Sequence, residues 1–427
     1  MRETGVRRGD VEIHTVEWQP VHAADEPPVL LLHGLSSNSY FWSRIAERLP
    51  WRRVVAIDQR AHGASSTPAT GYEPAELAAD AAYVIEQLEL ERPVVAGHSW
   101  GASIALQLGA DRPELIGGLV IVDGPVTPMS ERLTWEEAQR IMQPPLPLYA
   151  DVSEAVAERK RYLGHVWGAD LDRFVEHGLV REGTGWRLPL TEKIRFEILR
   201  AMFFQDYLQQ WPLVRGPILL ALAIGTGTDS FYEFKKAGSD ALKQQRPDIV
   251  VHWYRTFHDI PVEDPDGLAA DIERTALRAG FADLADRVSG LSGDWTVPAG
   301  YPESEGDGTW TAKDLLAHLS STEATLPTMV KANPASHDPA KAPFDPDRWN
   351  ASMIRRRREM LPAELIDEFH DGTQSLDPLL AELELEEPIG MGRVEGRPKG
   401  DGMRYLHRHQ GAHLADLQAA LTGTVGS

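Results

Sequence analysis

Residues 94–106, VVAGHSWGASIAL, decide the fold of this chain. Val94–Ala96 is a short apolar run typical of a buried strand, and Ala102–Ala110 has helical spacing. Between them, Gly97-His98-Ser99-Trp100-Gly101 fits the pattern G-x-S-x-G. In a strand–turn–helix context the glycines let the helix pack closely on the strand, while the serine sits on a tight turn with its hydroxyl projecting. The stretch therefore predicts that Ser99 is a nucleophile.

Apolar runs of strand length recur along the first 270 residues. Turn residues bound each run, and segments with helical spacing, such as Pro74–Leu90, separate several of them. The further runs are Val29–Leu32, Val54–Ile57, Leu119–Val122, Ile218–Leu222 and Ile249–Val251. Short apolar strands that alternate with helices predict a parallel sheet covered on both faces. The alternating stretch Val11–Trp18 predicts an antiparallel edge strand.

A serine nucleophile needs a base and a carboxylate that orients it. His258 follows the last predicted strand in a loop, whereas His252 lies inside that strand. The loop belongs to the carboxyl edge of a parallel sheet, where such folds place their chemistry, so we favour His258. Asp229 is the first acid after the strand at Ile218, and Asp123 ends the preceding strand. We prefer Asp229 as the acid and keep Asp123 as the alternative.

Residues 1–270 resemble an α/β-hydrolase of the esterase, C–C hydrolase and haloperoxidase-like branch. The resemblance rests on LLLHGLSSNSYFW, DQRAHGASS, GHSWG and FHDIPVEDP, which occur in the order of the family. It implies an oxyanion hole made by the backbone N–H groups of Leu35 and Trp100, and no cofactor for this domain. The chain departs from the family in two places. Asp229 lies further from its strand than the usual acid, and Ala61 replaces a customary glycine.

The identity of the nucleophile narrows the reaction. Relatives that open epoxides or displace halide have an aspartate where this chain has Ser99, so a serine implies attack on a carbonyl carbon. The substrate would be an ester, lactone, thioester or amide, or a ketone in C–C cleavage. Residues 125–216 resemble the family's helical cap, and their aromatic side chains indicate an apolar or aromatic acyl group, although packing within the cap explains part of them. These side chains are Trp135, Tyr149, Trp167, Trp186, Phe203, Phe204, Tyr207 and Trp211.

After Ile272 the strand pattern disappears, and helical spacing continues across the presumed boundary. Three more helical segments follow, near 311–330, 347–384 and 402–421, and loops rich in glycine and proline separate them. Four helices with polar outer faces predict a bundle. We therefore expect an α/β domain over residues 1–272 and an all-α domain over residues 273–427.

Three histidines of the predicted bundle share its inward faces. His409 and His413 lie one turn apart on the last helix, and His318 lies on the inward face of the 311–330 helix. Imidazoles from two helices predict a Zn²⁺ or Ni²⁺ site with an open position. The alternative is that they are hydrogen-bonded packing residues. Thr311 and Asp314 predict a capping box at the start of the same helix.

Residues 273–427 resemble the DinB-like bundle superfamily, which includes mycothiol-dependent maleylpyruvate isomerases. The motifs are WTAKDLLAHL, MLPAELIDEF and HRHQGAHLADL. The resemblance implies that His318, His409 and His413 are metal ligands and that a mycothiol-like thiol is a cofactor. Because the chain contains no cysteine, any thiol would arrive as a small molecule.

The formal charge of −21 argues against nucleic acid and anionic membranes as partners. The N-terminus lacks the apolar stretch of a secretory signal and no apolar run could span a bilayer, so we expect a cytoplasmic enzyme. The leading hypothesis is a serine hydrolase of a small-molecule acyl substrate, fused to a metal-binding bundle. The alternative is a non-catalytic, receptor-like hydrolase fold whose bundle serves homodimerisation.

Overall fold

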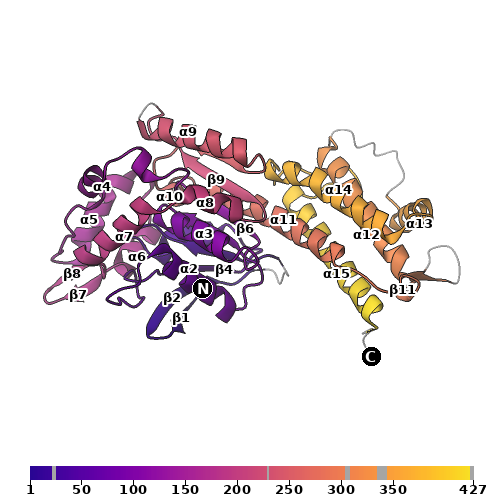
Figure 1. Cartoon of the computed structure of the whole chain (residues 1–427), viewed down its shortest axis with the longest axis horizontal. Coiled ribbons are helices and arrows are strands. Elements are labelled where there is room, and N and C mark those ends of the chain that lie inside the picture. Colours follow the sequence, from indigo (N-terminus) through magenta and orange to yellow (C-terminus); the bar gives the residue numbers. More distant parts are fainter. Residues whose placement is uncertain (22–25, 228–229, 303–307, 334–343, 424–427) are drawn as a thin grey trace. The chain divides into compact units, whose positions relative to one another are not determined.

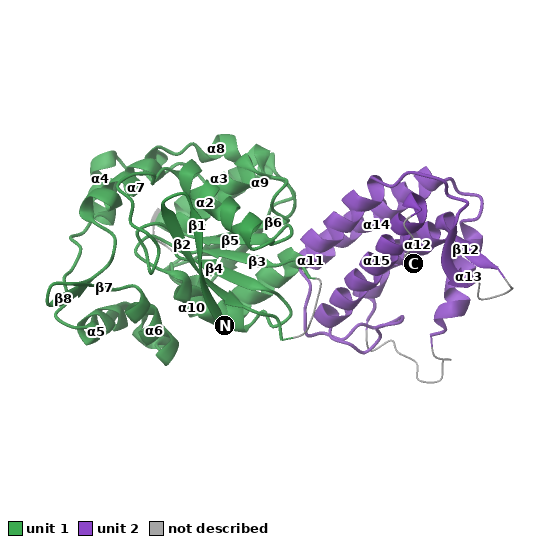
Figure 2. Ribbon diagram, turned by 90° about the horizontal axis from the view of Figure 1, so that it is seen from below, with its two compact units in different colours: residues 1–276 green, residues 277–427 purple. Residues whose placement is uncertain are grey.

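A computed structural model of the chain divides into two compact units, residues 1–276 and 277–427 (Figure 2). It describes residues 1–21, 26–227, 230–302, 308–333 and 344–423. The division falls within a continuous helix, α11 (Pro265–Ser289), which also passes through the boundary expected after residue 272. Across the described ranges, the helices are all too short or too polar to cross a membrane.

Unit 1 is built on a mixed eight-stranded sheet in the order β1-β2-β4-β3-β5-β6-β9-β10 (Figure 1). β2 is antiparallel to both of its neighbours, β1 and β4. The six strands β4-β3-β5-β6-β9-β10, in this spatial order, are parallel to one another. The strands are β1 (Arg2–Arg8), β2 (Val11–Trp18), β3 (Val29–Leu32), β4 (Val54–Ile57), β5 (Val94–His98), β6 (Gly118–Val122), β9 (Ile218–Ala223) and β10 (Val250–Tyr254). The predicted α/β class is thus confirmed for this unit. Val11–Trp18 is antiparallel as predicted, but the prediction that it is an edge strand is wrong, because β1 pairs along its outer side.

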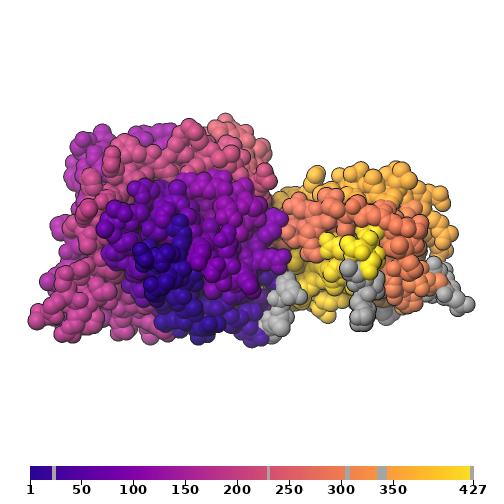
Figure 3. Space-filling view, turned by 60° about the horizontal axis from the view of Figure 1, so that its bottom comes forward, coloured from indigo at the N-terminus to yellow at the C-terminus, as the bar shows by residue number. Residues whose placement is uncertain are grey.

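The central strands are apolar throughout because both faces of the sheet are covered. Every residue of β3, β4, β5 and β6 is buried. The flanking helices are α1 (Ser43–Glu47), α2 (Pro74–Gln87), α3 (Trp100–Asp111), α9 (Ser230–Gln245), α10 (Ile260–Glu263) and the first part of α11. β1 was not predicted, because its sequence RETGVRR buries only Val6. Figure 3 shows the N-terminal residues at the surface of the unit, as expected for an edge strand.

The cap lies between β6 and β9 in the sequence. Its elements are η2 (Met129–Glu131), α4 (Trp135–Met142), α5 (Val152–Leu163), η3 (Gly164–Val166), α6 (Ala169–His177), β7 (Val180–Glu182), β8 (Gly185–Arg187), α7 (Glu192–Phe204), α8 (Tyr207–Gln210) and η4 (Trp211–Leu213). Trp135 packs edge-on against Phe203, with 5.3 Å between the ring centroids, and also contacts Phe204. Part of the aromatic content of the cap therefore packs within the cap itself.

Unit 2 is mainly helical. The second part of α11 packs its apolar side chains, such as Phe281, into one core with α12, α14 and α15. The remaining elements are β11 (Pro298–Pro302), β12 (Thr309–Thr311), α12 (Ala312–Lys331), α13 (Pro346–Arg356), α14 (Pro362–Ala381) and α15 (Lys399–Thr422). The predicted capping box of Thr311 and Asp314 is confirmed. The segment expected to be one helix over 347–384 is two helices, because Pro362 disfavours helical backbone at Leu361, whose ψ is 154°.

Candidate functional site

Ser99 lies on a strained turn between β5 and α3. Its φ of 54° and ψ of −115° are rare for a residue with a side chain, and such strain is typical of functional sites. The flanking glycines are required by close backbone contacts. A Cβ at Gly97 would lie 2.3 Å from the oxygen of Gly101, and a Cβ at Gly101 would lie 2.3 Å from the oxygen of Leu32. The turn has the geometry of the nucleophile elbow that the sequence predicts.

His258 is paired with a carboxylate at the end of β6. Its Nδ1 lies 2.7 Å from Oδ2 of Asp123. A carboxylate accepts, so Nδ1 carries the proton and Nε2 is left with its lone pair in the neutral ring. Asp229, the acid preferred from the sequence, lies outside the described residues. His252, the alternative base, is instead hydrogen-bonded to Asp271 at 2.9 Å.

The surroundings of the pair shift both pKa values. Burial alone would raise the pKa of Asp123, but its hydrogen bond to His258 and the nearby Lys235 lower it to about 2. Burial alone would lower the pKa of His258, and the hydrogen bond and charge of Asp123 outweigh this and raise it. The His258 side chain is 54% exposed, and this exposed surface faces a cavity. The carboxylate is therefore ionised at neutral pH and stabilises an imidazolium beside it.

Two buried histidines shape the loop after β3 that carries Leu35. His33 donates from Nδ1 to the oxygen of Gly34 at 2.7 Å and accepts at Nε2 from the N–H of Gln59 at 3.0 Å. His62 accepts at Nε2 from the N–H of Ser36, also at 3.0 Å. Burial lowers the pKa of His33 to about 4 and that of His62 to about 3, so both rings are neutral and able to accept.

This loop lies against the nucleophile. A Cβ at Gly34 would lie 3.3 Å from Cβ of Ser99, and the N–H of Trp100 opens helix α3 directly after the serine. The loop that carries Leu35 and the start of α3 at Trp100 therefore both adjoin Ser99. The sequence did not assign roles to His33 and His62, although both belong to the motifs that define the family.

A further histidine supports the base. Nε2 of His98 lies 2.9 Å from the backbone oxygen of His258, and the two rings are 4.7 Å apart. Because a carbonyl only accepts, His98 donates this hydrogen bond. Burial and the neighbouring His258 lower the pKa of His98 to about 4. His98, the residue before Ser99, therefore fixes the loop that carries His258, a role that we did not predict from the sequence.

Ser99, Asp123 and His258 line one cavity of about 460 Å³. Most of its wall is apolar, formed by residues after β6, by the cap and by the start of α9. The apolar side chains are Val126, Met129, Leu133, Ile141, Met142, Met202, Ile224, Phe231, Phe234 and Phe257. Of the cap aromatics named from the sequence, Tyr207 lines the cavity. The rings that shape it come mainly from outside the cap.

The cap is tied to the sheet at a carboxylate from the DQRAHG motif. Oδ2 of Asp58 accepts from His14 of β2 at 2.9 Å and from His177 of cap helix α6 at 2.6 Å. The same oxygen accepts from the N–H of Ala64 at 3.0 Å. These His and Asp atoms are close enough to hold a metal, but three hydrogen bonds already occupy the shared oxygen. We interpret the cluster as a structural anchor of the cap.

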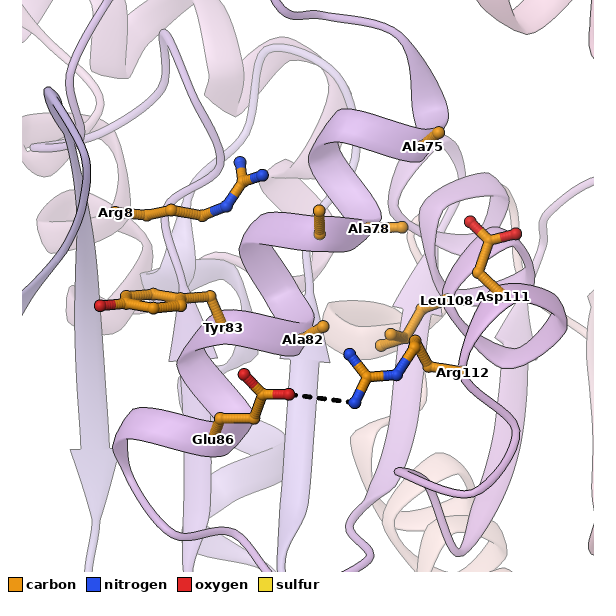
Figure 4. A pocket seen from close by; sticks show the side chains of 10 residues that line it. Arg8, Ala75, Ala78, Ala82, Tyr83, Glu86, Leu108, Asp111 and Arg112 are labelled. Carbon is orange, nitrogen blue, oxygen red and sulfur yellow. Dashed lines mark hydrogen bonds and ion pairs between the residues drawn. The ribbon is translucent and has the colours of Figure 1, made fainter.

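A second cavity of unit 1, of about 350 Å³, lies over α2 and α3 (Figure 4). Its floor is formed by small side chains such as Ala78 and Ala82, and an ion pair of Arg112 and Glu86 at 3.0 Å lies at its rim. The described residues around it include no serine, cysteine or histidine. These residues therefore offer neither the serine nor the histidine of a serine hydrolase.

In unit 2 the three predicted histidines converge. One ring nitrogen from each of His318, His409 and His413 lies within 4.8 Å of the others. The His409 and His413 ring centroids are 4.4 Å apart, and His318 lies 5.8 Å and 5.0 Å from them. Burial lowers the pKa of His318 to about 3 and of His409 to about 4, so these imidazoles are neutral, as metal ligands must be.

A tyrosine fixes the tautomer of one of these histidines. Tyr301 donates its hydroxyl proton to Asp416, so its oxygen accepts from Nδ1 of His413, 2.9 Å away. The Nε2 lone pair of His413 is then available to a metal. Hydrogen bonds of this kind orient histidine ligands in metal sites. The donor set fits Zn²⁺ or Ni²⁺.

A cavity of about 310 Å³ adjoins these histidines. His318 and His409 line it, together with Arg393 and mainly apolar side chains such as Trp349 and Met391. Two of the three histidines therefore border a space large enough for a small molecule.

Comparison with known proteins places the first unit in a family. A family model of the alpha/beta hydrolase fold matches residues 27–160. Lipase LipV of Mycobacterium tuberculosis is 31% identical over 190 residues, which are 42% of this chain and 68% of the lipase. The 2-(acetamidomethylene)succinate hydrolase of Mesorhizobium japonicum is 38% identical over 98 residues, 23% of this chain and 35% of the relative. The chain belongs to the α/β-hydrolase family.

The extent of these matches varies. The chain spans 35% to 36% of the length of several curated relatives that it matches. The crystal structure of E-2-(acetamidomethylene)succinate hydrolase aligns with a TM-score of 0.55 at 22% identity, covering 64% of this chain and 98% of that one. At this identity the likeness supports the fold alone.

Proposed function

We propose that unit 1 is a serine hydrolase of carbonyl substrates and that Ser99, His258 and Asp123 form its triad. The observation that carries the proposal is the hydrogen bond from His258 to Asp123 beside a cavity that Ser99 also lines. Asp123 replaces Asp229 in our assignment, because Asp123 occupies the position at Nδ1 that a triad acid takes.

The residues divide the chemistry as follows. The hydroxyl of Ser99 attacks the carbonyl carbon, and its proton passes to Nε2 of His258. Asp123 stabilises the imidazolium, and the N–H groups of Leu35 and Trp100 hold the oxyanion. The imidazolium then protonates the leaving group, and water releases the acyl group by the same steps. The substrate of this reaction is an ester, a lactone or a thioester.

The cavity indicates the kind of acyl group. Its volume of about 460 Å³ is in the usual range for small ligands, and its wall is mainly apolar. An apolar acyl or aryl group fits this wall better than a charged one. The relative LipV is named a lipase, and this supports carboxylic esters as the substrates.

Turnover of p-nitrophenyl esters tests the proposal. We expect hydrolysis by the wild type and its loss in Ser99→Ala. Ser153→Ala, which changes an exposed serine of the cap outside this cavity, is the matched control and should remain active. Binding of esters without turnover would favour the receptor-like alternative.

We further propose that unit 2 holds one Zn²⁺ or Ni²⁺ on His318, His409 and His413, as in the DinB-like bundles that it resembles. Bound there, the metal would lower the pKa of a coordinated water or thiol. The tautomer of His413 and the adjoining cavity support a site of this kind, and a mycothiol-like thiol is the cofactor that we propose for it.

Metal analysis of the purified chain tests this second proposal. About one Zn or Ni per chain should be found. It should be lost in the double variant His409→Ala, His413→Ala and retained in His370→Ala, a histidine outside the cluster. The proposal would be contradicted if the folded protein bound neither ion when Zn²⁺ and Ni²⁺ were both supplied.

A further inference from the structure

Lys235 of helix α9 contacts the acid of the proposed triad. Its Nζ lies 2.8 Å from Oδ1 of Asp123 and also donates to the backbone oxygen of Ala223. The N–H of Ala223 donates to the same Oδ1 at 2.9 Å. The side chain of Lys235 is 15% exposed and that of Asp123 is 6% exposed. This is therefore a mostly buried ion pair.

The two oxygens of Asp123 have separate partners. Oδ1 is held by Lys235 and Ala223, while Oδ2 faces Nδ1 of His258. A carboxylate that is fixed at one oxygen cannot rotate without losing these bonds. Lys235 thus keeps Oδ2 directed at the base.

We propose that Lys235 is a positioning residue that orients Asp123 and limits the basicity of His258. The inference rests on the triad proposed above and adds a component that neither the sequence motifs nor the comparisons supply. The ammonium group lies 2.8 Å from the carboxylate of the acid–base pair. It favours the ionised carboxylate and opposes protonation of the imidazole.

Three charged groups shift the pKa of His258, namely Asp123, Asp259 and Lys235, and Lys235 is the cation among them. Asp123 and Asp259 favour the imidazolium, whereas Lys235 opposes it. His98 packs against the ring at an interplanar angle of 46°, and burial keeps His98 neutral. Arg132 lies in the same cavity wall. Removing Lys235 should therefore leave two carboxylates acting on the imidazole and raise its pKa.

The chain provides a matched control in the adjacent lysine. Lys236 pairs with Asp240 at 2.6 Å, and both side chains are about half exposed or more, at 49% and 60%. It belongs to the same helix but does not contact the triad. Lys236→Met tests whether loss of any lysine in α9 changes the site.

The pKa of His258, measured by NMR titration of its ring, is the direct readout, and His258→Gln identifies the resonance. In Lys235→Met we expect this pKa to rise by about 0.5 to 1 unit. The acidic limb of kcat/KM against pH should move upward by the same amount. In Lys235→Arg and in Lys236→Met the pKa of His258 should stay at the wild-type value. If Lys235→Met does not fold, Lys235→Gln takes its place.

A His258 pKa that is unchanged or lowered in folded Lys235→Met or Lys235→Gln would overturn the inference. The titration does not depend on turnover, so the two proposals fail separately. A wild type without esterase activity, or a Ser99→Ala variant that keeps it, would instead overturn the proposed triad.

Discussion

Nδ1 of His258 lies 2.7 Å from Oδ2 of Asp123, a residue 135 positions earlier in the chain. The contact joins the loop after β10 to the end of β6, two strands that are separated by β9 in the sheet. It fixes which nitrogen of the base faces the cavity. The hydrolytic account of unit 1 depends on this pair.

Replacing the acid should remove most of the activity. In Asp123→Asn we expect kcat to fall about a thousandfold to ten-thousandfold, because the amide no longer stabilises the imidazolium. Ester hydrolysis at saturating substrate measures the effect. Asp240→Asn, an exposed acid on α9, should change kcat little. Full activity of Asp123→Asn would assign the acid elsewhere, with Asp229 the first residue to test.

The pH profile should show the raised pKa of His258. Attack requires the neutral imidazole, and Asp123 holds the His258 pKa above its ordinary value of 6.5. Activity is therefore present above this raised pKa and is lost as the pH falls through it. The measurement is kcat/KM of the wild type from acidic to alkaline pH. An acidic limb well below 6.5 would contradict the pairing.

The elbow glycines should be intolerant of a side chain. Gly101→Ala places Cβ against the oxygen of Leu32, and we expect the free energy of unfolding to fall by about 2 kcal/mol or more. Chemical denaturation measures the loss. Gly164→Ala is the control, since no atom lies within 4 Å of a Cβ there. Equal stability of the two variants would mean that the turn is not packed as described.

Tyr301 should influence metal affinity without being a ligand. Tyr301→Phe removes the acceptor of the His413 Nδ1 proton, and we expect the affinity for Zn²⁺ to fall about tenfold or more. Competition with a chelator measures it. Tyr162→Phe, an exposed tyrosine of the cap, should leave the affinity unchanged. If neither variant binds less tightly, the tautomer of His413 does not determine the site.

The placement of Ser99 and His258 in one site could be predicted from the sequence because their signals are local. The elbow needs glycines at fixed offsets from Ser99, and the base follows a recognisable strand. The inward spacing of His409 and His413 is likewise a property of one helix. In each case a few consecutive residues determine where the side chain lies.

The acid could not be selected in the same way. Asp123 and Asp229 both follow strands of the parallel sheet, and the sequence favoured Asp229 by its order in the chain. Which carboxylate reaches His258 depends on the path of the β10 loop and on the contacts of Lys235, which are not local. The supporting roles of His33, His62 and His98 were missed for the same reason, since each acts through a backbone group far along the chain or in a neighbouring turn.

Labelling by a fluorophosphonate probe tests the central claim most directly. Mass spectrometry of the folded wild type should find one covalent adduct, on Ser99, because a hydroxyl activated by His258 attacks the phosphorus. Ser99→Ala should carry no adduct, and Asp123→Asn should label far more slowly. A folded wild type that remains unlabelled, or that is labelled at a different serine, would contradict the claim.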